Sequence, residues 1–232
     1  MPVRHSSRTQ PYPTLVAEGV ARVAVGRGPL ASNVYFVGCG ASWTLVDAGW
    51  AHRSSLIAAA ARDLFGDSAP AAIVLTHIHP DHSGSALELA ERWSLPVHVH
   101  PLELPFAAGR YLPESANPLD RWLIAPLLRV LPQGPPSRLA EVARGFDPAD
   151  GALGLDDWQC LHTPGHTPGH IVFFRPRDRV LLSGDALLTI DTNSLRGGPP
   201  MRVLPETRPS SELQEFARRF CGGVPSWVLV ED

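Results

Sequence analysis

The sequence predicts an α/β domain (of the α+β kind), in which short apolar strands lie between amphipathic helices. Closely spaced apolar segments separated by glycines occupy the N-terminal part, and they indicate an antiparallel meander. Residues 72–76 then form a continuous apolar run between two helical patterns, as expected for a buried strand of a crossover unit. The length of 232 residues suits one domain with a full core, so residues 1–232 are expected to form a single domain.

The expected elements of the N-terminal half alternate between strands and helices. Its strands are rich in Val, Leu and aromatic residues, and its helices are apolar on one face. We expect strands at residues 15–25, 33–37, 42–47, 72–76 and 97–99, and helices at residues 52–65 and 83–93. Gly66 ends the first of these helices.

The C-terminal half begins with residues 101–150, which are rich in proline and leucine. An apolar helical pattern at residues 117–130 favours a helical lid or a substrate-facing insertion, and the alternative is a structural connection packed on the core. Beyond this segment we expect strands at residues 158–161, 171–174, 180–182 and 227–230, and a helix at residues 211–220.

Composition narrows the classes of function. A formal net charge of -3 gives no reason to expect a nucleic acid or an anionic membrane as a partner. No apolar run approaches the ~20 residues of a membrane helix, and residues 1–13 lack the apolar middle of a secretion signal. A cytoplasmic protein that acts on a small-molecule substrate is therefore expected. Because all 20 basic residues are arginine, a Walker-type phosphate lysine and a Schiff base are excluded.

The three cysteines, Cys39, Cys160 and Cys221, are odd in number and widely spaced. This argues against a disulfide framework and against a structural zinc site of the Cys-x-x-Cys type. We expect all three to be small buried hydrophobic residues, with Cys160 the nearest in sequence to the second histidine cluster.

Two histidine-rich segments indicate a metal site. The first reads Thr76-His77-Ile78-His79-Pro80-Asp81-His82, and the second reads His162-Thr163-Pro164-Gly165-His166-Thr167-Pro168-Gly169-His170. Because His77 and His79 are two residues apart at the end of a strand, both rings can point to one side. Pro80 turns the chain, so that the following Asp and His can face a second metal position. Such ligands suit zinc first, and also iron or manganese. His98, His100 and His162 are expected to be structural.

Together with Val46-Asp47-Ala48-Gly49 and Ser183-Gly184-Asp185, these segments resemble the metallo-β-lactamase superfamily. The resemblance extends over residues 15–195 and keeps the order of the family's motifs. It implies a four-layer αββα sandwich, in which two mixed sheets pack face to face with helices outside. The metal site would lie at one edge of this sandwich.

The resemblance also implies a role for each residue of the site. Site 1 would consist of three imidazoles, from His77, His79 and His166. Site 2 would contain Asp81 and His82, and Asp185 would bridge the two sites. Behind these ligands, Asp47 would fix the first histidine loop and His170 would order the second by hydrogen bonding.

The segment after Asp185 departs from the family's pattern. The family supplies a last histidine, in a Gly-His context, from a strand after the bridging Asp, whereas His170 is the final histidine of this sequence. Residues 196–201 read Arg-Gly-Gly-Pro-Pro-Met and resemble the neighbourhood of that histidine with the His removed. We therefore expect an incomplete site 2, a shortened second half of the sandwich and an atypical C-terminal segment at residues 196–232.

The resemblance implies a metal-dependent hydrolase, in which hydroxide on one or two zinc ions attacks a small ester, thioester, lactone or related substrate. Asp81 would be the catalytic residue that accepts or delivers the proton. Two alternatives stay open, namely a mononuclear iron oxygenase of the same fold and a catalytically impaired remnant that lacks the final site-2 histidine. Residues 227–230 would cover the edge of the second sheet, or an exposed edge would support a homodimer.

Overall fold

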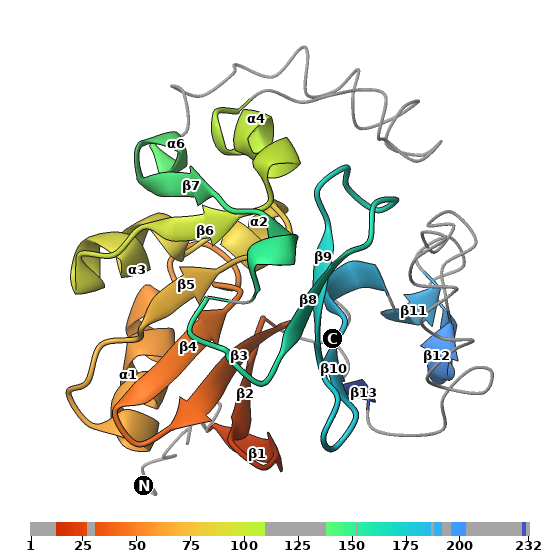
Figure 1. Cartoon of the computed structure of the whole chain (residues 1–232), viewed down its shortest axis with the longest axis horizontal. Helices are drawn as coiled ribbons and strands as arrows, with labels where there is room; N and C mark the ends of the chain where they lie inside the picture. Colours follow the sequence, from red (N-terminus) through yellow and green to blue (C-terminus); the bar gives the residue numbers. More distant parts are fainter. Residues whose placement is uncertain are drawn as a thin grey trace, which may run out of the picture.

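The computed structural model describes residues 13–26, 31–109, 138–151 and 153–186, and the backbone of three further stretches, 188–191, 196–202 and 229–230. Within these residues two β-sheets pack face to face, and helices cover the outer face of the larger sheet (Figure 1). This arrangement confirms the predicted α/β sandwich.

The larger sheet has the strand order β1-β2-β3-β4-β5-β6-β7. Its strands are β1 (Thr14–Ala17), β2 (Val20–Val25), β3 (Ser32–Cys39), β4 (Ser42–Val46), β5 (Ala72–Val74), β6 (Val97–Val99) and β7 (Ala143–Gly145). The first four strands pair antiparallel, and from β4 to β7 the pairing is parallel. The sheet thus joins the predicted meander to the predicted crossover unit.

The central strands β3, β4 and β5 are buried on both faces over most of their length, which explains their largely apolar sequences. On β3, Val34 and Phe36 belong to the core beneath the helices, whereas Tyr35 and Val37 belong to the core between the sheets. Two helices, α1 (Ser54–Phe65) and α3 (Ala86–Trp93), pack on the outer face. Each contributes apolar residues at helical spacing to that outer core.

The second sheet has the order β13-β10-β9-β8. Its strands are β8 (Gln159–His162), β9 (Ile171–Arg175), β10 (Val180–Leu182) and β13 (Leu229–Val230). Ile171, Phe173 and Leu182 are fully buried between the sheets. Strand β13 pairs in parallel with β10, so residues 229–230 of the expected strand at 227–230 cover this edge of the sheet.

Two element boundaries differ from the sequence prediction. Residues 15–25 form two strands rather than one, because Gly19 adopts a left-handed conformation (φ 66°) that closes a hairpin between β1 and β2. The predicted helix at residues 83–93 begins only at Ala86, as α3, and a separate short helix, α2 (Pro80–Ser83), precedes it. At the break, Gly84 packs so closely that a Cβ there would lie 2.2 Å from the Ala51 nitrogen.

The ends of the segment 101–150 belong to the core, which for these residues favours the alternative of a structural connection packed on the core. Strand β7 extends the larger sheet, and Ala107 of α4 (Leu104–Ala107) and Leu139 of α6 (Leu139–Val142) are buried in the outer core. Burial of these apolar side chains against the sheet stabilises the fold. The helical pattern at residues 117–130 lies outside the described residues, so a lid there stays a prediction.

Backbone beyond Asp185 forms a small separate ribbon. Strand β11 (Leu188–Asp191) pairs antiparallel with β12 (Arg196–Arg202), which contains the Gly-Gly-Pro-Pro run. The expected helix at residues 211–220 lies outside the described residues, as does Cys221. In the part of the chain that the structure describes, no helix is long and apolar enough to cross a membrane.

The cysteines in the described part of the chain differ from each other in burial. Cys160 is buried as expected, whereas Cys39 is exposed, because it is the last residue of β3, next to the turn that leads to β4. Burial raises the pKa of the Cys160 thiol to about 12, so this residue is an unreactive part of the core between the sheets.

Candidate metal centre

The six residues predicted to bind metal come from three segments that meet at one edge of the two sheets. They are His77, His79, Asp81 and His82 after β5, His166 between β8 and β9, and Asp185 in a 3-10 turn after β10. The Thr76 carbonyl accepts a hydrogen bond from the Ile171 nitrogen at 3.0 Å. The first histidine segment is therefore attached directly to a strand of the second sheet.

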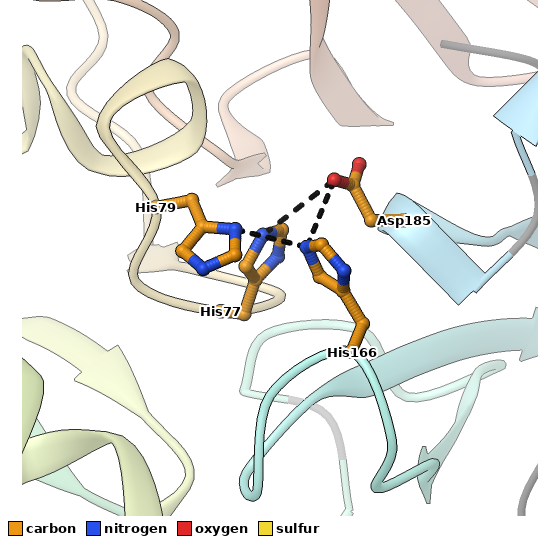
Figure 2. Close-up of side chains that lie close together, drawn as sticks. All are labelled: His77, His79, His166 and Asp185. Atoms are coloured by element: carbon orange, nitrogen blue, oxygen red, sulfur yellow. Dashed lines mark hydrogen bonds and ion pairs between the residues drawn. The ribbon is translucent and has the colours of Figure 1, made fainter. Parts of the chain in front are cut away.

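Four of these side chains form the larger of two donor clusters. One atom each from His77, His79, His166 and Asp185 lies within 4.8 Å of the others. Figure 2 shows the three rings and the carboxylate turned toward one another, with Asp185 on the opposite side from His79. The His166 Nε2 atom lies 2.9 Å from His79 Nδ1 and 3.0 Å from Asp185 Oδ2.

The second cluster contains Asp81, His82 and Asp185, again within 4.8 Å of one another. His82 Nε2 lies 3.0 Å from Asp185 Oδ1 and 3.6 Å from Asp81 Oδ2. Asp185 therefore points one oxygen at each cluster, which is the geometry expected of a bridging ligand. Among the described residues this second cluster has three donors, one fewer than the first.

The donor atoms fit a divalent cation. His77 is completely buried, and its Nε2 atom has no hydrogen-bond partner among the described atoms. A buried nitrogen without a partner costs free energy unless it meets a cation or a donor. On the other side of the ring, His77 Nδ1 lies 3.0 Å from Thr76 Oγ1, which itself bonds to Asp47. This chain of hydrogen bonds favours hydrogen on Nδ1 and leaves the Nε2 lone pair free.

Two of the site-1 imidazoles, those of His77 and His79, are held in the neutral form that metal binding requires. Burial, together with the neighbouring His82 ring, lowers the pKa of His77 well below its ordinary value. Burial and the His166 ring lower the pKa of His79 to about 3. Both rings therefore present a lone pair at neutral pH without first having to lose a proton.

The second cluster has the opposite electrostatic character. Burial opposes a charge on His82, but the carboxylates of Asp185 and Asp47 outweigh it and raise the pKa of His82 well above its ordinary value. Burial also opposes ionisation of Asp185, whose pKa is nevertheless held well below its usual range by His82 and His166. The Asp185 carboxylate is thus ionised and faces positive charge, which a cation would also supply.

Asp81 is the most accessible acid of the centre. Its side chain is about one third exposed (31%), whereas those of the imidazoles in its cluster and of Asp185 are far less so. Burial and the nearby Asp185 carboxylate raise the pKa of Asp81, although His82 acts against them. The Ser32 hydroxyl donates to the Asp81 carbonyl at 2.6 Å and fixes the backbone of this turn to β3.

Further contacts to the histidine segments involve Asp47 and His170, the two residues predicted to fix these loops. Asp47 Oδ1 accepts a hydrogen bond from the Thr76 nitrogen at 2.8 Å, and Oδ2 lies 2.9 Å from His82 Nδ1. His170 is fully buried, and its Nδ1 atom lies 2.7 Å from Thr163 Oγ1. Neither residue belongs to a donor cluster.

The remaining histidines of the described chain have other surroundings. His162 Nε2 lies 2.8 Å from the Pro168 carbonyl, and the ring stacks on His100 with centroids 4.1 Å apart. His98 packs edge-on against Phe146. None of the three lies in a cluster of metal donors found in the described residues.

Sequence reasoning missed two residues that hold the centre in shape. Thr76 connects Asp47 to His77 through its hydroxyl. Glu103 is completely buried and bonds to backbone of both histidine segments. One signal for Glu103 was available, because it is a lone acid in the apolar run Pro101-Leu102-Glu103-Leu104-Pro105 just after a strand.

Comparisons with known proteins agree with this geometry. Residues 27–221 match the family model described as the metallo-beta-lactamase superfamily. A Bacillus subtilis protein named as the probable metallo-hydrolase YflN is 35% identical over 196 residues, which cover 78% of this chain and 74% of that protein. A hydroxyacylglutathione hydrolase of Xylella fastidiosa is 29% identical over 154 residues, 66% of this chain but only 46% of the relative.

Solved structures give the same result for the fold. The crystal structure of TTHA1623 in a di-iron-bound form has a TM-score of 0.52 at 31% identity, covering 84% of each chain. The BLEG-1 B3 metallo-beta-lactamase has a TM-score of 0.53 at 27% identity, covering 77% of this chain and 78% of that one. The shared fold extends over most of the chain.

Proposed function

This chain belongs to the metallo-beta-lactamase superfamily, and from that premise we propose that it is a metal-dependent hydrolase of small thioesters, esters or lactones. The observation that carries the proposal is the first donor cluster, in which three imidazoles and one carboxylate lie within 4.8 Å of one another. Three neutral imidazoles with a coordination position left for water are typical of hydrolytic zinc sites.

The residues of the first cluster would hold the ion, with Asp185 shared toward the second. Bound there, a divalent ion supplies a Lewis acid, which polarises the substrate carbonyl and lowers the pKa of a coordinated water to about 7. Zinc is the first choice because imidazole nitrogen suits it. Iron is the second, supported by the related protein solved in a di-iron-bound form.

Asp81 is the residue proposed to move the proton. Its raised pKa allows it to take up a proton near neutral pH more readily than an ordinary aspartate does. Its partial exposure gives that proton a route to solvent, which the buried Asp185 carboxylate lacks. Ser32 and the α2 backbone hold the turn in place while the proton moves.

A thioester is the first substrate class to test. The support is the similarity to hydroxyacylglutathione hydrolases, which covers 66% of this chain. The chain spans about half the length of those relatives, so their substrate is a proposal for this protein. Esters and lactones share the same electrophilic carbonyl and are the next candidates.

The test measures hydrolysis of a hydroxyacylglutathione, a chromogenic ester, a lactone and a chromogenic cephalosporin by the full chain, with zinc or with iron. Activity on at least one of the first three should disappear with a chelator and with His166→Ala. The activity should survive His52→Ala, because the His52 side chain is 92% exposed and lies outside the donor clusters. Bound iron together with oxygen uptake would show that the protein is an oxygenase and not a hydrolase. Metal binding without turnover of any substrate would indicate an impaired remnant.

A further inference from the structure

The Glu103 carboxylate connects the two histidine segments through their backbones. Its Oε2 atom accepts a hydrogen bond from the Ile78 nitrogen at 2.9 Å, and its Oε1 atom accepts one from the Gly169 nitrogen at 2.8 Å. Ile78 lies between the site-1 residues His77 and His79, and Gly169 lies in the loop that contains His166. One side chain thus spans the two loops whose rings must meet at the metal.

The turn that presents Glu103 is itself fixed on both sides. The Glu103 nitrogen donates to the His100 carbonyl at 2.8 Å, and His100 Nδ1 accepts from the Leu102 nitrogen. The His100 ring stacks on His162, whose Nε2 atom lies 2.8 Å from the Pro168 carbonyl. The turn therefore contacts the second loop through two independent contacts and cannot move away from it freely.

Close packing at Gly169 supports the same conclusion. A Cβ added there would lie 2.8 Å from Glu103 Cγ and 2.9 Å from Oε1, closer than real Cβ contacts. Gly169 does not lie in the left-handed region, so its backbone conformation does not by itself call for glycine. The glycine is needed here because the Glu103 side chain occupies the space beside it.

We propose that Glu103 is a positioning residue, which holds the two histidine loops at the separation that a shared metal ion requires. Glu103 belongs to neither donor cluster, and each of its oxygens accepts a hydrogen bond from a backbone nitrogen. Its effect on binding comes from preorganisation: without Glu103, the ion itself must order the loops, and affinity falls accordingly. This inference rests on the metal centre of the proposed function.

The test compares the full-length Glu103→Gln variant with the parent chain. Glutamine keeps the size of the side chain but offers one acceptor and one NH2 group, so only one of the two backbone N–H groups keeps a partner. The expected result is a loss of zinc affinity of about tenfold or more, measured by chelator competition. The visible spectrum of the cobalt(II) form should also change, because the relative positions of the rings change.

Glu91→Gln is the matched control. Glu91 is half exposed and pairs with Arg138 at the surface, so the same change of charge there should leave zinc affinity unaltered. A purely structural role for Glu103 would lower the melting temperature of the metal-free and zinc-loaded forms equally. An unchanged zinc affinity and cobalt spectrum in folded Glu103→Gln would overturn the inference.

Gly169→Ala tests the same contact from the other loop if Glu103→Gln is not recovered folded. Its Cβ must displace the Glu103 side chain or the loop, so a loss of zinc affinity supports the inference and an unchanged affinity overturns it. A parent chain that binds no metal is a different result. It would remove the metal centre itself, and the role of Glu103 with it.

Discussion

The buried Asp47 carboxylate lies 2.9 Å from Nδ1 of the buried His82 ring and thereby determines which nitrogen of that ring faces the metal centre. With hydrogen on Nδ1 bonded to Asp47, Nε2 is the nitrogen that faces Asp185, and it can bind a metal ion once it has given up its proton. The other Asp47 oxygen accepts from the Thr76 nitrogen, so the carboxylate cannot turn away without losing a buried hydrogen bond.

Asp47→Asn should weaken binding of a second ion while leaving the first in place. The Thr76 nitrogen requires an acceptor, so the asparagine oxygen stays there and the NH2 group faces His82. His82 Nδ1 must then accept, which puts hydrogen on Nε2 and removes the lone pair from site 2. We expect a loss of about tenfold to 100-fold in the affinity of the weaker site, measured by calorimetric titration with zinc. An equal loss at both sites would contradict this assignment.

Purified protein should retain one tightly bound metal ion per chain. The first cluster offers four donor residues, whereas the second offers three in the described chain and shares Asp185 with the first. The sequence has no histidine after His170 that could add an imidazole to site 2. Elemental analysis after extensive dialysis is the measurement. Two ions retained under the same conditions, with full turnover, would refute the incomplete-site argument.

His166→Ala and His170→Ala should differ in their effect on metal binding. His166 has its Nε2 atom within 3.0 Å of both His79 and Asp185, whereas the hydrogen-bonded nitrogen of His170 contacts Thr163. We expect His170→Ala to reduce affinity by about 10–100-fold through loss of loop order, and His166→Ala to reduce it further. Chelator competition on both variants checks the order. Equal losses would count against the separate roles.

Much of this centre could be predicted from the sequence because its signals are local. His77 and His79 stand two residues apart at a strand end, and a continuous apolar run identifies β5 before them. The apolar sequence of residues 227–230 also predicted a strand, but covering of the sheet edge was only one of two alternatives, and the pairing of residues 229–230 with β10 comes from the structure. Local patterns of this kind need no knowledge of distant contacts.

Other features could not be predicted because they depend on contacts between distant segments. The role of Glu103 depends on hydrogen bonds to backbone nitrogens of two loops, and neither loop is near Glu103 in sequence. Strand β7 was missed since Ala143–Gly145 is only three residues long and its pairing partner, β6, lies far upstream. The exposure of Cys39 depends on where β3 ends, and strand ends are the least reliable part of a sequence-based assignment.

The ion pair between Arg175 and Asp178 should make stability depend on pH. Two hydrogen bonds of 2.8 and 2.7 Å join the Arg175 guanidinium to the Asp178 carboxylate, and they lower the pKa of that carboxyl. A carboxyl group whose pKa is lower in the folded than in the unfolded chain stabilises the fold through its ionised form. This stabilisation is fully present at pH values above the pKa of the unfolded chain, which is about 3.9 for aspartate. That contribution disappears as the pH falls through the folded pKa.

Asp178→Asn should therefore lower the free energy of unfolding at pH 7 by about 1 kcal/mol, with a smaller difference from the parent chain below about pH 4. Arg175 is buried (3% exposed) over the Trp158 ring, so it loses a partner that solvent replaces poorly. Urea unfolding at a series of pH values is the measurement. Asp67→Asn is the control, because Asp67 and its partner Arg62 are both largely exposed and should contribute little. A difference that persists unchanged into acid would show that the cost of Asp178→Asn does not come from its charge.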